Sequence, residues 1–429
     1  MAKIVIEGGR RLQGTVRIGG AKNAVLPILA ASVLASDGAS HIDDVPSLLD
    51  VEHMSQTIAA LGADVQRRPG SIRIDATHVN TYEPPHDLVR QMRASFVVAG
   101  PLLARVGEAV IALPGGCNIG PRPVDLHIKG LEAMGAEARI ENGCVHFRAP
   151  KGGLRGTRIY LDIPSVGATQ NIMMAACLAR GTTIIENAAK EPENVDLANY
   201  LNAMGARVRG AGTDIIRIEG VGEMHGANHN VIPDRIEAGT FLIAGAIAGN
   251  GVYVENVVSQ HLTSLLAKLE EAGALIEDDV QGIRVYPVEH GRMRALDVKT
   301  HYHPAYPTDL QAQMVAALCT AVGTSTITET VFENRFMHVA ELQRMGADIQ
   351  VEGRTAIIEG IHRLSGAEVT STDLRAGAAL VIAGLVADGI TTVGGLHHID
   401  RGYDNLVGKF QGLGARIERI EESVEVEVG

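Results

Sequence analysis

The sequence predicts an α/β protein of two inside-out barrel domains, each built from three repeats of about 70 residues with buried helices and outer sheets. Three observations support this prediction. The chain has 429 residues, which exceeds the usual size of a single domain. A Gly-Ala motif recurs six times along the chain, and an Ala-rich apolar segment recurs between its copies.

The Gly-Ala motif is expected to mark the C-terminal end of an amphipathic helix in each repeat. Its pattern is apolar-x-x-apolar-Gly-Ala, as in IAALGA and LEAMGA. Glycine is favoured there because many helices end in a left-handed backbone conformation that glycine adopts without strain. A short alternating segment, typical of a strand, follows most copies. The copies end at Ala63, Ala136, Ala206, Ala274, Ala347 and Ala415.

The Ala-rich segments predict helices that lie inside the domains. They are apolar on nearly every side, and a helix without a polar face is typical of a buried position. A β-rich run follows most of them, for example TTIIEN at 182–187 and STITET at 325–330. The segments end at Gly38, Gly107, Gly181, Gly251, Gly323 and Gly389.

Six repeats in sequence favour two domains of three. The boundary is expected near Ile232 and Pro233, after the stretch GEMHGANHN at 222–230. A first strand from Lys3 to Glu7 precedes the first helix and could pair with either domain.

Composition excludes several classes of protein. The net charge of −12 argues against a nucleic-acid-binding surface. No apolar run reaches the roughly 18 residues of a membrane span, and the N-terminus lacks a signal-peptide core. The cysteines form no CxxC pair, which fits reduced thiols in a cytosolic protein. They stand at positions 117, 144, 177 and 319.

The stretch LPGGCNIGPRPVDL at 113–126 is predicted to be a mobile surface loop, because its glycines and prolines oppose regular structure. It would expose Cys117 close to Arg122, and a new helix would start at Pro123 or Val124 and run through Leu131. A thiol beside a guanidinium suggests an anionic substrate and an acid–base or nucleophilic thiol. A Gly-rich turn with a bystander cysteine is the alternative.

Several segments together resemble those of the enolpyruvyl transferases. The resemblance covers essentially the whole chain and implies a pair of inside-out α/β domains with three repeats each. It also implies that the N-terminal strand belongs to the second domain, so the domains would be 22–232 and 1–21 with 233–429. The segments are AKNAVLP (21–27), LPGGCNIGPRPVDLH (113–127), PTDLQAQ (307–313), TETVFENRFMHV (328–339), TDLRAGAAL (372–380) and HIDRGY (398–403).

The branch of the family that the chain resembles most transfers the enolpyruvyl group of phosphoenolpyruvate to the 3-hydroxyl of UDP-N-acetylglucosamine and releases phosphate. This is the first committed step of peptidoglycan synthesis in the cytoplasm. The resemblance implies no metal or organic cofactor. Such a site must bind phosphate, carboxylate and diphosphate groups, protonate an alkene carbon and deprotonate an alcohol.

The resemblance also assigns roles to individual residues. Cys117 would be the general acid, and Asp309 the base near the sugar hydroxyl. Lys22 and Arg401 complete the expected catalytic group, and Arg122 would hold phosphoenolpyruvate together with Arg401. The expected substrate-binding residues are Lys22, Asn23, Arg93, Arg122, Pro123, Val124, Asp125, Leu126, Ser165, Val166, Gly167, Asp309, Val331, Arg335, Arg375 and Arg401.

The residues themselves leave plainer interpretations open. Lys22 stands at the start of the first buried helix, where an anion is favoured, but it could be an ordinary exposed lysine. Ser165 could offer backbone N–H groups to a diphosphate or only cap its helix. Asp309 could likewise be a cap. Ile163 and Pro164 occupy positions where the family usually carries a lysine, so one charge contact to the nucleotide would be absent or supplied elsewhere.

Two other functions are compatible with parts of the sequence. The first is 5-enolpyruvylshikimate-3-phosphate synthase, which runs the same chemistry on a smaller acceptor; the cysteine loop and PRPVDLH argue against it. The second is a ring of six repeats around DNA, like a sliding clamp, which requires a basic inner face.

The histidine pairs at 301 and 303 and at 397 and 398 suggest a zinc site, but no further ligands stand at metal spacing. The oligomeric state is not predicted.

Overall fold

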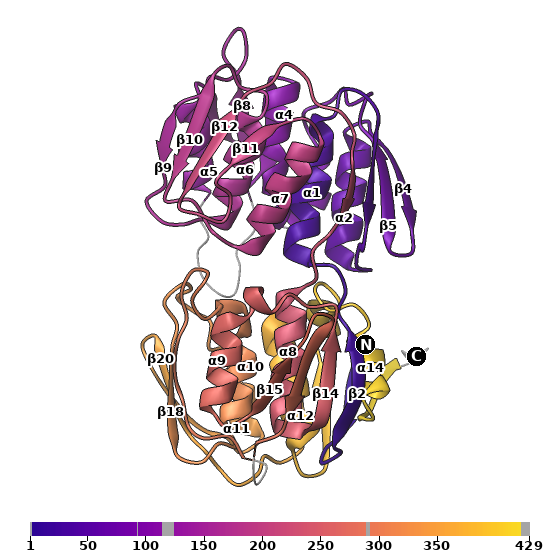
Figure 1. The fold of residues 1–429 in the computed structure, drawn as a ribbon, viewed down its shortest axis with the longest axis vertical. Coiled ribbons are helices and arrows are strands. Elements are labelled where there is room, and N and C mark those ends of the chain that lie inside the picture. Colours follow the sequence, from indigo (N-terminus) through magenta and orange to yellow (C-terminus); the bar gives the residue numbers. More distant parts are fainter. Residues whose placement is uncertain (1, 92, 114–123, 289–291, 422–429) are drawn as a thin grey trace, which may run out of the picture. The chain divides into compact units, whose positions relative to one another are not determined.

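The computed structural model describes residues 2–91, 93–113, 124–288 and 292–421. The chain divides into two compact units. Among the described residues, the first unit contains 20–113 and 124–232, and the second contains 2–19, 233–288 and 292–421. In both units, strands lie outside and enclose the helices (Figure 1).

In its described residues, the first unit has three sheets, with strand orders β13-β3-β5-β4, β6-β8-β7 and β11-β12-β10-β9. Its strands are β3 (Ala39–Asp43), β4 (Asp64–Arg68), β5 (Ser71–Asp75), β6 (Glu108–Ala112), β7 (Glu137–Glu141), β8 (Cys144–Arg148), β9 (Arg158–Tyr160), β10 (Thr182–Glu186), β11 (Arg207–Arg209), β12 (Ile215–Glu219) and β13 (Asn228–Asn230). Its helices are α1 (Lys22–Ala31), η1 (Ser32–Leu34), α2 (Leu49–Ala60), α3 (His86–Gln91), η2 (Arg93–Val98), α4 (Ala99–Arg105), α5 (Asp125–Ala133), α6 (Val166–Ala176) and α7 (Pro192–Ala203).

The second unit repeats this plan, with sheets ordered β21-β22-β1-β23, β15-β16-β14-β2 and β17-β18-β20-β19. Its strands are β1 (Ala2–Glu7), β2 (Leu12–Arg17), β14 (Gly249–Glu255), β15 (Leu275–Asp278), β16 (Gly282–Tyr286), β17 (Asp297–Lys299), β18 (Thr324–Thr328), β19 (Asp348–Glu352), β20 (Thr355–Glu359), β21 (Glu368–Thr370), β22 (Ile390–Gly394) and β23 (Arg416–Glu421). Its helices are α8 (Arg235–Ala248), η3 (Ser259–His261), α9 (Thr263–Glu271), η5 (Thr308–Leu310), α10 (Gln311–Leu318), α11 (His338–Arg344), α12 (Leu374–Val386), α13 (Leu396–Ile399) and α14 (Leu406–Gly412).

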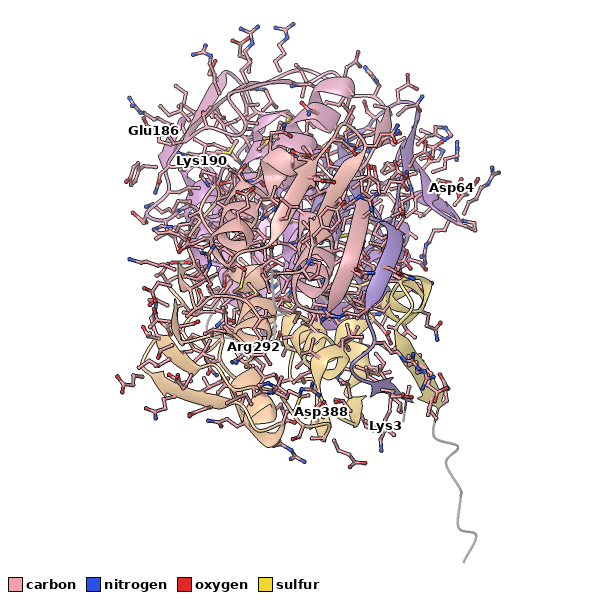
Figure 2. All side chains as sticks on the ribbon, turned by 60° about the horizontal axis from the view of Figure 1, so that its bottom comes forward. Lys3, Asp64, Glu186, Lys190, Arg292 and Asp388 are labelled. Carbon is pink, nitrogen blue, oxygen red and sulfur yellow. The ribbon has the colours of Figure 1, made fainter. Side chains whose placement is uncertain are left out.

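The Ala-rich segments form the buried helices, as predicted. Every residue of α8 and of α10 is buried. Each unit has its own apolar core built around such helices, while charged side chains such as Asp64 of β4 point outward (Figure 2). Small residues let these helices approach closely: a Cβ on Gly239 of α8 would lie only 2.5 Å from the side chain of Leu310. The predicted glycines lie a few residues beyond the helix ends, most of them in the short connection before the next strand, whereas Gly251 lies within β14 itself.

The glycine of all six Gly-Ala motifs has a left-handed backbone, with φ between 89° at Gly414 and 103° at Gly62. This confirms the predicted helix ends. The first strand, β1, pairs antiparallel with β22 and β23 and so belongs to the second unit. Strand β2 pairs in parallel with β14. It was not predicted from the sequence, because only Leu12 and Val16 of its six residues are buried and so the apolar pattern of a strand is weak.

The helix predicted after the cysteine loop begins slightly later than expected. It is α5, which begins at Asp125 and extends past Leu131 to Ala133. Among the helices in the described ranges, none is both long and apolar enough to cross a membrane.

Candidate active site

The predicted site residues fall on both units. Cys117, Arg122 and Pro123 lie outside the described residues. Arg93 is the first residue of η2, directly before the buried helix α4, as predicted.

Lys22 is the first residue of α1 and lies beside the carboxylate of Asp50 in α2. The Nζ–Oδ2 distance is 2.6 Å, and the side chains are only 12% and 3% exposed. An ordinary exposed lysine is therefore the wrong interpretation of this position. Its neighbour Asn23 is exposed. Asp50 was not expected from the sequence, because nothing in its local pattern links it to Lys22.

The start of α6 is capped by Ser165, whose Oγ accepts a hydrogen bond from the backbone N–H of Ala168 at 3.3 Å. Val166 and Gly167 are the first helical residues. The amide end of this helix is accessible, since Val166 and Gly167 are only half-buried, whereas the rest of α6 is buried. Such a helix start favours an anion through its N–H groups and its dipole.

His127 of α5 faces this helix start. A Cβ added to Gly167 would lie 3.1 Å from His127 Nε2, so only glycine leaves the ring its full space. The side-chain amide of Asn171 fixes the ring: its Nδ2 lies 3.0 Å from His127 Nδ1, and its Oδ1 accepts from the N–H of Gly100 at 2.5 Å. Because Nδ2 donates, Nδ1 accepts, and the neutral ring carries its proton on Nε2. The sequence interpretation missed His127.

The other predicted residues at the start of α5 differ in how exposed they are. Val124 precedes the helix, Asp125 is exposed, and Leu126 points into the core with 8% exposure. Ile163 is 51% exposed at the position where a lysine was expected. A cation does lie near it, because Lys129 of α5 reaches the adjacent Asp162 over 2.6 Å.

In the second unit, Asp309 is held between two arginines. Its Oδ1 accepts from Arg335 Nη2 at 2.6 Å, and its Oδ2 accepts from Arg375 Nη2 at 3.1 Å. The arginine side chains are 5% and 4% exposed, whereas Asp309 is 27% exposed. Asp309 lies in η5 and is not the N-cap of α10, a position taken by Leu310. The capping interpretation is therefore wrong, since both carboxylate oxygens face guanidinium groups.

The guanidinium group of Arg375 remains charged despite its burial. Burial alone would lower the pKa of Arg375, but Asp309, Tyr403 and Asp234 together outweigh burial and raise this pKa above its ordinary value. Arg375 also lies 5.5 Å over the ring of Tyr403. The result is a partly exposed carboxylate whose two oxygens are held by fixed positive charges, which orient it and favour its charged form.

Val331 and Arg401 lie in loops of the same unit. The backbone N–H of Val331 donates to Glu329 Oε1 at 2.7 Å. Arg401 follows the short helix α13 and is half-buried. Across the described part of the chain, no three His, Cys, Asp or Glu side chains are placed to share a metal ion.

Comparison with known proteins gives a consistent result. The family described as EPSP synthase (3-phosphoshikimate 1-carboxyvinyltransferase) matches residues 6–410. UDP-N-acetylglucosamine 1-carboxyvinyltransferase 1 of Halalkalibacterium halodurans is 59% identical over 99% of this chain and 96% of its own length. UDP-N-acetylglucosamine 1-carboxyvinyltransferase 1 of Staphylococcus aureus is 57% identical over 98% of this chain and 100% of its own length.

Two solved structures share the fold. The enolpyruvyl transferase NikO of Streptomyces tendae superposes with a TM-score of 0.88 at 24% identity, covering 98% of this chain and 99% of its own. EPSP synthase of Acinetobacter baumannii superposes with a TM-score of 0.75 at 20% identity, covering 98% of this chain and 100% of its own.

Proposed function

The chain belongs to the EPSP synthase family of enolpyruvyl transferases, and we propose that it transfers the enolpyruvyl group of phosphoenolpyruvate to the 3-hydroxyl of UDP-N-acetylglucosamine, releasing phosphate. The observation that carries this proposal is the identity of 57–59% to UDP-N-acetylglucosamine 1-carboxyvinyltransferases over nearly the full chain. The EPSP synthase structure, by contrast, is only 20% identical.

In the proposed reaction, Asp309 takes the proton of the sugar 3-hydroxyl. The resulting oxygen attacks C2 of phosphoenolpyruvate, while the thiol of Cys117 gives its proton to C3. Loss of a C3 proton and of phosphate then restores the double bond in the product. Because Arg335 and Arg375 hold both oxygens of Asp309, the carboxylate is oriented before substrate arrives, which avoids a reorganisation cost during the reaction.

The anionic groups of the substrates match the cations and helix starts of the chain. Lys22, Arg122 and Arg401 are proposed to hold the phosphate and carboxylate of phosphoenolpyruvate. The start of α6 is proposed to receive the diphosphate of the nucleotide, with the Nε2–H of His127 as an added donor. Asn23, Arg93, Val331 and residues 124–126 are proposed to contact the sugar nucleotide.

Such an enzyme acts in peptidoglycan synthesis, and through it in cell-wall growth and division. We place it in the cytoplasm, which fits the reduced cysteines. The thiol of Cys117 is the proposed target of the alkylating antibiotic fosfomycin.

The choice of acceptor is tested by measuring phosphate release from phosphoenolpyruvate with two alternative acceptors. UDP-N-acetylglucosamine should support turnover, and shikimate 3-phosphate should not. Turnover with shikimate 3-phosphate alone would reassign the chain to the other branch of the family.

A further inference from the structure

Glu329 is a buried carboxylate directly after β18, with 1% exposure. Its Oε1 accepts from the hydroxyl of Thr300 at 2.8 Å and from the backbone N–H groups of Val331 and Phe332 at 2.7 and 3.1 Å. Its Oε2 accepts from the hydroxyl of Thr308 at 2.6 Å. Burying a carboxylate is costly unless its oxygens are satisfied, and these four donors satisfy both.

The hydrogen bond from Thr308 to Glu329 determines the direction of a second hydrogen bond, the one between Thr308 and Arg335. A threonine hydroxyl has a single proton, and that of Thr308 is donated to Glu329. The lone pairs of Thr308 Oγ1 therefore accept from Arg335 Nη1, which lies 2.8 Å away. The other arm of the same guanidinium, Nη2, donates to Asp309. Hydrogen bonds thus run from Glu329 through Thr308 and Arg335 to the proposed catalytic base.

Glu329 constrains Arg335 from a second side as well. The guanidinium carbon of Arg335 lies 5.0 Å from the ring centre of Phe332, whose backbone N–H is bound by Glu329. Glu329 therefore binds two residues that contact the guanidinium group of Arg335. One is Thr308, whose hydroxyl accepts a hydrogen bond at its edge, and the other is Phe332, whose ring lies under its face. Small displacements at a reacting group are costly, since about 1 Å can reduce a rate about a hundredfold.

We propose that Glu329 is a positioning residue that sets the orientation of Arg335 and, through it, of Asp309. This inference rests on the proposed function, in which Asp309 is the base. Glutamine cannot replace Glu329 here. If its Nε2 faces Thr308, it forces the hydroxyl proton toward Arg335 Nη1, so that two donors meet. If its Nε2 faces Val331 and Phe332, it opposes two backbone donors.

The test compares Glu329→Gln, Thr308→Val, the double variant and Thr308→Ser. Glu329→Gln and Thr308→Val should each lower kcat by about 10- to 100-fold, with a smaller change in KM for UDP-N-acetylglucosamine. Both changes break the same chain of hydrogen bonds. The kcat of the double variant should therefore be no lower than that of the slower single variant. Thr308→Ser keeps the hydroxyl and should stay within about threefold of the unchanged enzyme.

A matched control is the exposed pair Thr324 and Glu359 on the same sheet, which are joined by the same kind of bond at 2.5 Å. Glu359→Gln should not change kcat. Wild-type kcat in Glu329→Gln, or multiplying effects in the double variant, would overturn the inference. If Glu329→Gln does not fold, the Thr308 variants decide: equal activity of the valine and serine variants contradicts it.

A crystal structure of Thr308→Val separates this inference from the proposed function. The Arg335 guanidinium should turn away from its bond to Asp309 even if the protein acts on another acceptor. An unchanged Arg335–Asp309 pair would refute the positioning role. Failure of the unaltered protein to release phosphate with UDP-N-acetylglucosamine would instead refute the proposed function alone.

Discussion

Arg375 Nη2 donates to Asp309 Oδ2 over 3.1 Å, although the two residues are 66 positions apart in the chain. Asp309 comes from η5, before the buried helix α10, and Arg375 from the first turn of the buried helix α12. The starts of two internal helices thus bring the proposed base and its partner together.

Asp309→Asn should lower kcat by about 10²- to 10⁴-fold, the usual contribution of a general base. Asparagine keeps the size of the side chain but cannot take the proton of a hydroxyl group. Initial rates of phosphate release would measure the effect, and a thermal melt would check folding. Asp297→Asn is the control, because Asp297 is an exposed residue of the same unit that bonds Thr326. A kcat unaffected by Asp309→Asn would mean that another group is the base.

The four cysteines should differ sharply in reactivity. Burial raises the pKa of Cys177 and of Cys319 to about 12, so both remain thiols at neutral pH. Cys144 is buried as well. Iodoacetamide and fosfomycin should therefore modify Cys117 alone in the folded protein, as read by peptide mass spectrometry. Unfolding in urea should open all four to iodoacetamide, and early labelling of Cys177 or Cys319 in the native state would contradict this.

Replacing Cys117 tests its proposed role as an acid. Cys117→Ser should nearly abolish turnover, because a hydroxyl is a far weaker acid than a thiol. Cys117→Asp should remain active and resist fosfomycin, since a carboxyl group can give a proton but offers no thiolate. Full activity of the serine variant would show that the thiol is not the acid.

The fold was predictable because its signals repeat. Six Gly-Ala helix ends and six apolar helices reinforce one another, and each motif fixes a local conformation that tertiary contacts do not override. Strand β2 lacked such a signal, because half-exposed strands with few apolar residues resemble loops.

The site was only partly predictable, for a physical reason. Sequence motifs indicated Lys22, Asp309 and Arg375 but not the contacts that they make. Asp50 was not predicted, and Arg375 reaches Asp309 only through tertiary packing. Glu329 and His127 act on other side chains through hydrogen bonds that no spacing rule encodes. At Asp309 the sequence left helix capping open as an alternative, because aspartate is a favoured capping residue, but two arginines bind its carboxylate instead.

His338 should make the stability of the second unit depend on pH. Burial lowers its pKa from 6.5 to about 4, with Arg335 adding to the effect and Asp373 opposing it. The unfolded chain binds this proton more readily than the folded chain. The contribution to stability is therefore complete above about pH 6.5 and is lost as the pH falls toward 4, by roughly 3 kcal/mol at most.

His338→Asn should reduce this pH dependence. Urea unfolding at pH 7 and at pH 5 would measure it, and the loss of unfolding free energy between the two should be smaller in the variant by about 2 kcal/mol. His362→Asn is the control, because His362 is exposed in the folded chain. Equal losses in the unaltered protein and in His338→Asn would contradict the prediction.

Arg401→Ala should weaken phosphoenolpyruvate binding by about ten- to a hundredfold. A charge-assisted hydrogen bond contributes roughly 1.5–3 kcal/mol, and this change removes one from an anionic ligand. Lysine at 401 should restore affinity only in part, because it lacks the two-armed geometry of a guanidinium. Affinity for UDP-N-acetylglucosamine should barely change, since its proposed pocket is built from other residues. Isothermal titration with each ligand measures both effects.

The neighbouring Arg419 provides a matched control for Arg401. Its guanidinium forms two bonds with Asp400, the residue next to Arg401, at 2.8 and 3.0 Å. Arg419→Ala removes one positive charge from the same surface, so it reproduces any general electrostatic loss. Because the guanidinium of Arg419 is already bound to Asp400, the affinity of Arg419→Ala for phosphoenolpyruvate should stay within about twofold of that of the unaltered protein. Similar weakening by both variants, or an equal loss of UDP-N-acetylglucosamine binding in Arg401→Ala, would show that Arg401 supports the fold and does not hold phosphoenolpyruvate.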